Sequence, residues 1–162
     1  MHRTSHRYAA SSAAFAAMAW SIIKVEKPGR GDATRYMNVS EKFHSDIPRV
    51  GGDYFLAINR NKRAITLEMK SPEGRKVCED LAAWADIVVQ NFRPGVTKRL
   101  GLDYESLRKI NPRLIYGNIS AYGMEGSMSE KAGMDIAVQA RSGLLRITGA
   151  ANSKEPVRPG SS

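Results

Sequence analysis

Cysteine is scarce in this chain: Cys78 is the single one among 162 residues, so the sequence cannot form an internal disulfide. This usage fits a reducing compartment. Cys78 falls in a helical pattern beside Val77, which favours a packed thiol over a nucleophile. His2, His6 and His44 are scattered, and no His or Cys pair has the spacing of a zinc site. The sequence therefore gives no support for a disulfide scaffold or a metal centre.

The common catalytic and nucleotide-binding motifs are missing as well. Neither Gly-rich phosphate-binding pattern is present, and no G-x-S-x-G string supports a Ser-His-Asp nucleophile. The apolar stretch at residues 8–23 is short and contains three serines, which argues against a transmembrane span. Any anion that this chain binds must be held by side chains and turns outside these motifs.

Acidic residues are few relative to basic ones, at 16 against 25, which gives a net charge of +9 and a pI of about 9.9. Such a balance favours a polyanionic partner. The cations are dispersed along the chain, and no helix-turn-helix, zinc or RNP pattern accompanies them. A phosphorylated small molecule therefore fits better than nucleic acid, although part of the charge is simply solvated surface.

The hydrophobic periodicity predicts alternating strands and helices. The predicted strands are residues 21–26, 64–67, 86–90 and 114–120, and the predicted helices are residues 53–60, 71–84, 103–110 and 134–145. This order is typical of an α/β fold with a Rossmann-like, mostly parallel sheet of about four strands and flanking helices. Residues 62 and 63 are expected to precede the second strand.

Two of these helices have clear start signals. Ser71 is the expected N-cap of one, with Pro72 at its first position, and Asp103 is the expected N-cap of another. Spacing predicts the buried faces: Val77, Leu81 and Trp84 in the first helix, and Tyr104, Leu107 and Ile110 in the second.

Ligands of parallel α/β sheets bind at the carboxyl ends of the strands. This rule selects Lys27, which follows the first strand, although an ordinary exposed loop lysine is an equal alternative. It also selects residues 68–70 after the second strand, and the loop at residues 91–101 (NFRPGVTKRLG) after the third.

Each residue of that loop has a physical use. Asn91 can donate and accept hydrogen bonds, and Phe92 offers a flat apolar face. Pro94 and Gly95 predict a tight turn that lets backbone N–H groups approach a ligand. Arg99 carries a planar fork suited to a phosphate. The loop could also merely connect a strand to a helix.

Several strings resemble class III CoA-transferases, in that family's order. They are IKVEKPGRGDATR, NRNKRAITLEMKSPEG, ADIVVQNFRPG, KRLGLDYESLRKINPRLIYGNISAYG and GMDIAVQARSGLLRITG. The resemblance runs from about Ile22 to the last residue. It implies transfer of CoA between an acyl-CoA thioester and a carboxylic acid, with coenzyme A as substrate or ligand, no metal, and no nucleic acid or membrane partner. The family forms interlocked homodimers, for which this chain is too short.

The resemblance also implies contacts residue by residue. The positions that it places at CoA are Lys27, Leu67, Glu68, Met69, Lys70, Asn91, Phe92, Arg93, Arg99 and Lys131. Met134 and Asp135 are the implied neighbours of the acyl site.

The family's nucleophile is an aspartate in a GD motif that would follow Ser162, so no catalytic residue is assigned in this chain. The expectation is a truncated form that binds CoA and transfers nothing. Racemases of the family carry a proton-moving His where this chain has Met134, which disfavours racemase activity. Asp135 is more often a helix cap than a catalyst at such a position.

The expected organisation has three parts: a degenerate segment at residues 1–19, a Rossmann-like domain at residues 20–149, and a tail at residues 150–162. The first segment, Ala-rich and basic, is interpreted as a truncated domain helix, with a transit peptide as the alternative. The corresponding localisation is cytoplasmic, or mitochondrial under the alternative. For the chain as a whole, a basic binding module and a non-functional gene fragment are the alternatives to a CoA-transferase.

Overall fold

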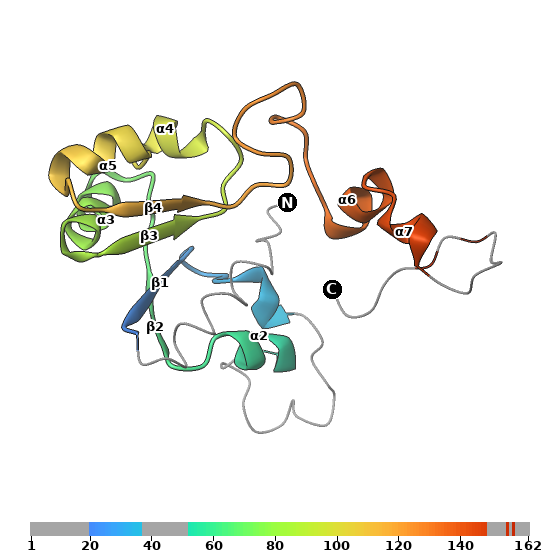
Figure 1. The fold of residues 1–162 in the computed structure, drawn as a ribbon. Coiled ribbons are helices and arrows are strands. Elements are labelled where there is room, and N and C mark those ends of the chain that lie inside the picture. Colours follow the sequence, from blue (N-terminus) through green and yellow to red (C-terminus); the bar gives the residue numbers. More distant parts are fainter. Residues whose placement is uncertain (1–19, 37–51, 149–154, 156, 158–162) are drawn as a thin grey trace.

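The computed structural model describes residues 20–36 and 52–148, together with Glu155 and Val157. The elements in chain order are β1 (Ile22–Glu26), the 3-10 helix η1 (Ala33–Tyr36), α2 (Asp53–Ile58), β2 (Lys62–Thr66), α3 (Pro72–Trp84), β3 (Ile87–Gln90), α4 (Val96–Leu100), α5 (Tyr104–Ile110), β4 (Ile115–Asn118), α6 (Asp135–Arg141) and α7 (Leu144–Ile147) (Figure 1). The predicted α/β class is confirmed. The expectations for residues 1–19 and for most of the tail lie outside the described residues.

The four strands found in the described residues pair in parallel, as expected, but they form two sheets of two strands rather than one sheet. β1 pairs with β2, with Ile22 opposite Lys62 and Glu26 opposite Thr66. β3 pairs with β4 from Ile87 opposite Ile115 onward. β2 begins two residues earlier than predicted, so Lys62 and Arg63 are part of the strand rather than of the loop before it.

The core of the second sheet lies between its strands and the helices above them. Ala82 of α3, Leu107 of α5, Leu102 and Leu114 form the buried cluster. Figure 1 shows α3 and α5 on the same side of the β3–β4 sheet. Cys78 packs against this cluster, as predicted, and burial raises the pKa of its thiol.

The predicted buried face of α3 is wrong. Trp84 is 61% exposed and Val77 is 39% exposed, whereas Gly74 and Ala82 are buried. Gly74 faces the turn that leads into the helix, where a Cβ would lie 2.0 Å from the Glu68 carbonyl oxygen, and Ala82 faces the core cluster. The bulky side chains are left on the outer side.

The other helices differ from expectation in smaller ways. In α5, Leu107 is buried as predicted, but Tyr104 and Ile110 are largely exposed. The single helix predicted over residues 134–145 is two helices, α6 and α7, because Gly143 takes a left-handed backbone conformation with φ of 79° between them. Figure 1 shows this pair standing apart from the sheets. Among the described residues, none of the helices reaches the length and apolarity of a membrane span.

Both predicted N-caps are confirmed. The Ser71 hydroxyl oxygen accepts a hydrogen bond from the Gly74 N–H at 2.9 Å. The Asp103 carboxylate accepts from the Ser106 N–H at 3.3 Å and from the Ser106 hydroxyl at 2.7 Å. The hydrogen bond from Ser106 holds the pKa of Asp103 below its ordinary value.

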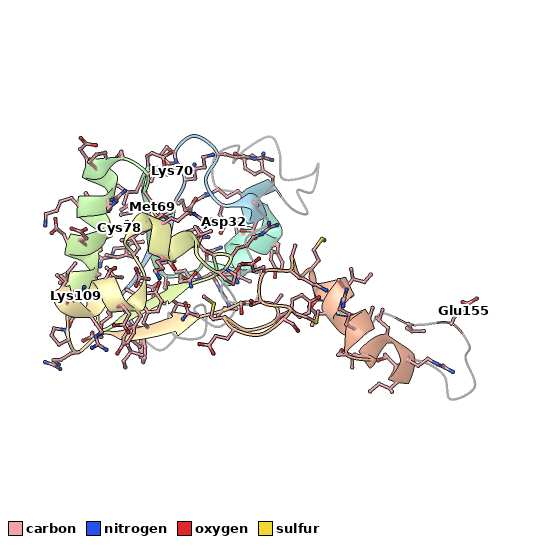
Figure 2. All side chains as sticks on the ribbon, turned by 90° about the horizontal axis from the view of Figure 1, so that it is seen from above. Asp32, Met69, Lys70, Cys78, Lys109 and Glu155 are labelled. Atoms are coloured by element: carbon pink, nitrogen blue, oxygen red, sulfur yellow. The ribbon has the colours of Figure 1, made fainter. Side chains whose placement is uncertain are left out.

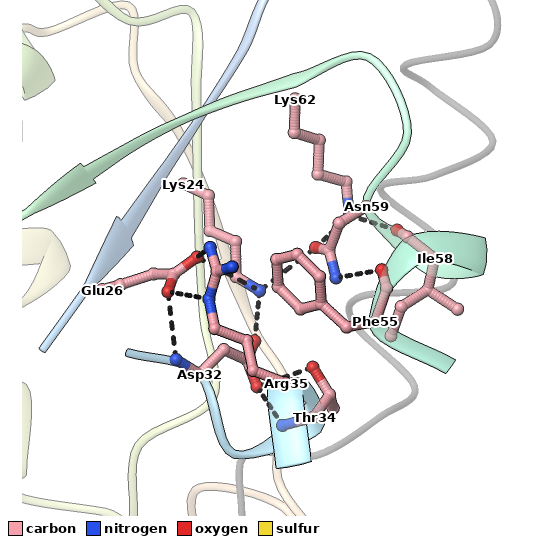
Figure 3. Close-up of polar contacts among 9 residues, drawn as sticks. All are labelled: Lys24, Glu26, Asp32, Thr34, Arg35, Phe55, Ile58, Asn59 and Lys62. Atoms are coloured by element: carbon pink, nitrogen blue, oxygen red, sulfur yellow. Dashed lines mark hydrogen bonds and ion pairs between the residues drawn. The ribbon is translucent and has the colours of Figure 1, made fainter. Parts of the chain in front are cut away.

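A cluster of buried charges fixes the chain beyond β1 (Figure 3). Lys24 and Glu26 lie on one face of the strand and are 6% and 5% exposed. Lys24 Nζ donates to the carboxylate of Asp32, and Arg35 donates to both oxygens of Glu26 at 2.9 Å. We call Lys24, Glu26, Asp32 and Arg35 the buried charge cluster. The cluster holds the turn of residues 27–31 in place, because the Asp32 N–H also donates a hydrogen bond to the Glu26 carboxylate at 3.0 Å.

The cluster changes the acidity of its members. Burial by itself would raise the pKa of Glu26, but the hydrogen bond from Arg35 and the nearby cations leave it below the ordinary value. Burial likewise opposes ionisation of Asp32, and the hydrogen bonds from Lys24 and Thr34 bring its pKa below the ordinary value. Lys62, which lies outside the cluster, is made less basic: burial, and then repulsion from Lys24, lowers its pKa from 10.5 to about 8.

Replacing Asp32 with Asn is expected to destabilise the fold strongly, because it leaves Lys24 buried without a carboxylate. Breaking a buried ion pair from one side costs about 3–5 kcal/mol, and urea unfolding measures the loss. The matched control is Asp80→Asn, which removes a carboxylate from the exposed Lys76–Asp80 pair on α3. The control should be nearly as stable as the original chain. Similar stability for the two variants would contradict the structural role of the cluster.

The low pKa of Lys62 predicts a pH dependence between pH 8 and pH 10.5. In that window the unfolded chain binds the proton on Lys62 and the folded chain does not, so this residue makes stability rise with pH. The measurement is the free energy of unfolding of the original chain and of Lys62→Met from pH 7 to pH 10.5. Taking the difference removes other titrating groups, such as Cys78 and Tyr116.

The advantage of the original chain over Lys62→Met should grow above pH 8. A difference that stays constant with pH would show that Lys62 is not desolvated in the folded state.

Candidate functional site

A cavity of about 450 Å³ lies between the segment after β2, the start of α3, and α4. It is lined by Lys70, Arg75, Val96, Arg99 and Leu100, and we call it the basic pocket. Two of these cations, Lys70 and Arg99, are residues that the sequence selected: Lys70 lies in the turn after β2, and Arg99 lies on α4 after β3. The structure therefore brings together two predicted site residues that are far apart in the sequence.

Lys70 is positioned by the turn that joins β2 to α3. The Leu67 N–H donates to the Glu26 carbonyl at 2.9 Å, which extends the pairing of β1 and β2 by one residue. The Glu68 side chain accepts from the Lys70 N–H at 3.1 Å, and Met69 packs against the core cluster. Of the predicted residues 67–70, only Lys70 therefore lines the pocket, while the others shape the turn (Met69 and Lys70 are labelled in Figure 2).

Arg99 is positioned by the loop after β3. Gly95 begins α4 with φ of 80°, a conformation that glycine adopts without strain. A Cβ at Gly95 would lie 3.3 Å from a terminal nitrogen of Arg99, so the guanidinium folds back over the turn. The predicted Pro-Gly turn is therefore confirmed, and it leads directly into α4.

Polar side chains hold the first part of the same loop. The Phe92 N–H donates to the Gln90 side chain at 2.6 Å, and the Asn91 side-chain amide donates to the Ile119 carbonyl. Asn91 thus ties the loop after β3 to the chain that follows β4. Phe92 is half-buried and Arg93 is exposed, and neither is among the residues that line the basic pocket.

Arg75 is the cation that sequence reasoning missed. Its Nε is buried, and within the part of the chain that the structure describes it has no hydrogen-bond partner. A buried donor without an acceptor costs about 1–3 kcal/mol. A signal for Arg75 was present in the sequence: it lies four residues after the N-cap Ser71, and helical side chains point toward the helix N-terminus. Arg75 therefore leans toward the loop that carries Lys70.

The basic pocket carries an excess of positive charge. Across residues 20–36 and 52–148, none of its three cations forms an ion pair. Positive groups gathered in a concave site attract and concentrate anions. Two guanidinium groups supply planar forks for phosphate or carboxylate oxygens, and the lysine supplies a point charge. The side chains of Val96 and Leu100 give the cavity an apolar wall. The arrangement suits a phosphorylated ligand with an apolar part.

The remaining predicted residues lie elsewhere. Lys27 is exposed on the turn clamped by the buried charge cluster, and Lys131 is exposed on the loop before α6. Met134 precedes α6 and is 49% exposed. Asp135 accepts a hydrogen bond from the Gln139 side chain at 2.5 Å. None of these four lines the basic pocket.

A second cavity, of about 340 Å³, lies at the amino ends of β3 and β4, next to Trp84, Asp86 and Arg113. Its lining contains one cation, Arg113, and one carboxylate, Asp86. Parallel sheets bind ligands at the carboxyl ends of their strands, and this cavity lies at the other end. The described residues contain no group of three or more potential metal ligands.

Comparison with known proteins agrees with the resemblance seen in the sequence. The human succinyl-CoA:glutarate CoA-transferase is 43% identical over 141 residues, which are 86% of this chain and 30% of that protein. The formyl-CoA:oxalate CoA-transferase of Rhodopseudomonas palustris is 43% identical over 109 residues, which are 65% of this chain and 24% of that protein. A crystal structure of a CAIB/BAIF family protein from Brucella suis superposes with a TM-score of 0.78 at 40% identity.

That superposition covers 87% of this chain and 36% of the Brucella protein. The chain thus spans about a third or less of the length of these relatives. The profile of CoA-transferase family III matches residues 10–162. On this match, supported by the fold and by relatives above 40% identity, the chain belongs to CoA-transferase family III.

Proposed function

We propose that the basic pocket binds the phosphate groups of coenzyme A. The observation that carries this proposal is the meeting of Lys70 and Arg99 in one cavity without a carboxylate counterion among the described residues. Coenzyme A carries phosphate anions on a nucleotide, which suits a pocket of cations with an apolar wall. The names of the relatives, which are CoA-transferases, support the same ligand.

The other predicted residues take supporting roles in this proposal. Lys27 and Lys131 are exposed cations outside the basic pocket, and we propose that they add to the general attraction for an anionic ligand. Asn91 acts by holding the loop after β3 in place. Phe92 and Arg93 lie on that loop outside the basic pocket and are proposed as further contacts for parts of the ligand that extend beyond it.

For the whole protein, the proposed reaction is transfer of CoA between an acyl-CoA thioester and a carboxylic acid. Met134 and Asp135, at the start of α6, are proposed as neighbours of the acyl group. A methionine side chain cannot take up or release a proton at neutral pH, so transfer of CoA is favoured over racemisation of an acyl-CoA. No residue of this chain is assigned as the nucleophile.

The test of CoA binding is isothermal titration of the full 162-residue chain with CoA. We expect Lys70→Gln and Arg99→Gln each to raise the Kd by about tenfold or more, the effect of removing one charge-assisted hydrogen bond. The control is Lys98→Gln, which removes the same charge from the neighbouring exposed position on α4. Its Kd should stay within about twofold of the original chain.

Absence of binding at millimolar CoA would refute the proposal. An equal loss of affinity in Lys98→Gln and Arg99→Gln would also count against it, because the attraction would then come from net charge and not from the pocket.

A further inference from the structure

Arg75 differs from the lysine next to it on α3. Lys76 is exposed and pairs with Asp80 four residues later at 2.6 Å. Glu79 stands at the same spacing from Arg75, yet no ion pair between them is found in the described structure. The Arg75 side chain instead lines the basic pocket, with its Nε buried and without an acceptor.

The surroundings hold the stem of Arg75 in this direction. A Cβ at Gly101 would lie 4.0 Å from Arg75 Cδ, so the aliphatic part of the side chain runs past the end of α4. Gly101 itself has φ of 70° and closes that helix. The guanidinium is therefore delivered to the pocket by packing of its stem, and its buried donor lacks the acceptor that an anionic ligand would supply.

The number of cations indicates which anion fits. A phosphate diester carries one negative charge, whereas a phosphate monoester carries about −1.5 to −2 at pH 7 and three acceptor oxygens. Two arginine forks and one lysine can donate to all three oxygens of a monoester and match its charge more closely. Coenzyme A has one phosphate monoester, at the 3′ position of its ribose, and dephospho-CoA lacks it.

The structure assigns Arg75 as the residue that makes this site specific for the 3′-phosphate of coenzyme A, an inference that rests on the proposed CoA binding. Lys70 and Arg99 supply the general attraction for phosphate. Arg75 supplies a fork whose buried Nε has no acceptor in the described structure and is satisfied when the monoester is present. Without the monoester, the donor stays unmatched.

The experiment is isothermal titration of the full chain with CoA and with dephospho-CoA, for the original chain and for Arg75→Gln, Arg75→Lys and the control Lys76→Gln. The original chain should bind CoA about tenfold or more tightly than dephospho-CoA. Arg75→Gln should lose that preference, with an almost unchanged Kd for dephospho-CoA. Arg75→Lys should keep part of the preference, because it retains the charge and loses the fork. Lys76→Gln should behave like the original chain.

The outcomes separate the two proposals. If the original chain binds neither compound, the proposed function fails and this inference fails with it. If the original chain binds CoA but Arg75→Gln keeps its preference, or loses affinity for both compounds equally, only the role of Arg75 is overturned. Thermal unfolding of each variant checks the fold, and if Arg75→Gln does not fold, an unchanged preference in Arg75→Lys overturns the inference.

Discussion

The path of the chain from β2 through α3 to β3 and α4 determines where it places its ligand chemistry. β2 and β3 belong to different two-stranded sheets, so the residues that follow them come together where the segment after β2, α3 and α4 meet. The segment after β2 carries Lys70, and the segment after β3 leads to Arg99. The helix α3 begins between them and adds Arg75. Three cations that are separated in the sequence thereby share one cavity.

The chain treats its two clusters of charged residues in opposite ways. In the buried charge cluster, two cations and two carboxylates satisfy one another, and their balance fixes the path of the chain after β1 (Figure 3). In the basic pocket, cations gather without carboxylates in the described part of the chain. A balanced cluster needs no ligand to neutralise it, whereas unbalanced cations in a concavity favour an anion. This contrast separates the structural charges from those proposed to bind coenzyme A.

The sequence predicted features that depend on local chemistry. The caps at Ser71 and Asp103 were visible because capping needs a particular side chain at a particular position. Lys70 and Arg99 could be selected because both follow predicted strands. The exposure of Trp84 could not be predicted, because the spacing of apolar residues does not reveal that the helix turns Gly74 and Ala82 inward. The division into two sheets depends on pairing between distant segments, which periodicity does not encode. Arg75 was missed because the rule of strand ends selects the segments that follow strands and not a position inside a helix, and its spacing from the N-cap was the signal left unused.

The most direct test of phosphate binding in the basic pocket is an experimental structure of the chain with coenzyme A bound. If the pocket binds these phosphates, oxygens of the ligand should lie within about 3 Å of Lys70 Nζ and of the Arg99 guanidinium, at hydrogen-bond distance. The 3′-phosphate should also accept from Arg75. Coenzyme A bound through Lys27 or beside Trp84, with only solvent in the basic pocket, would contradict the account.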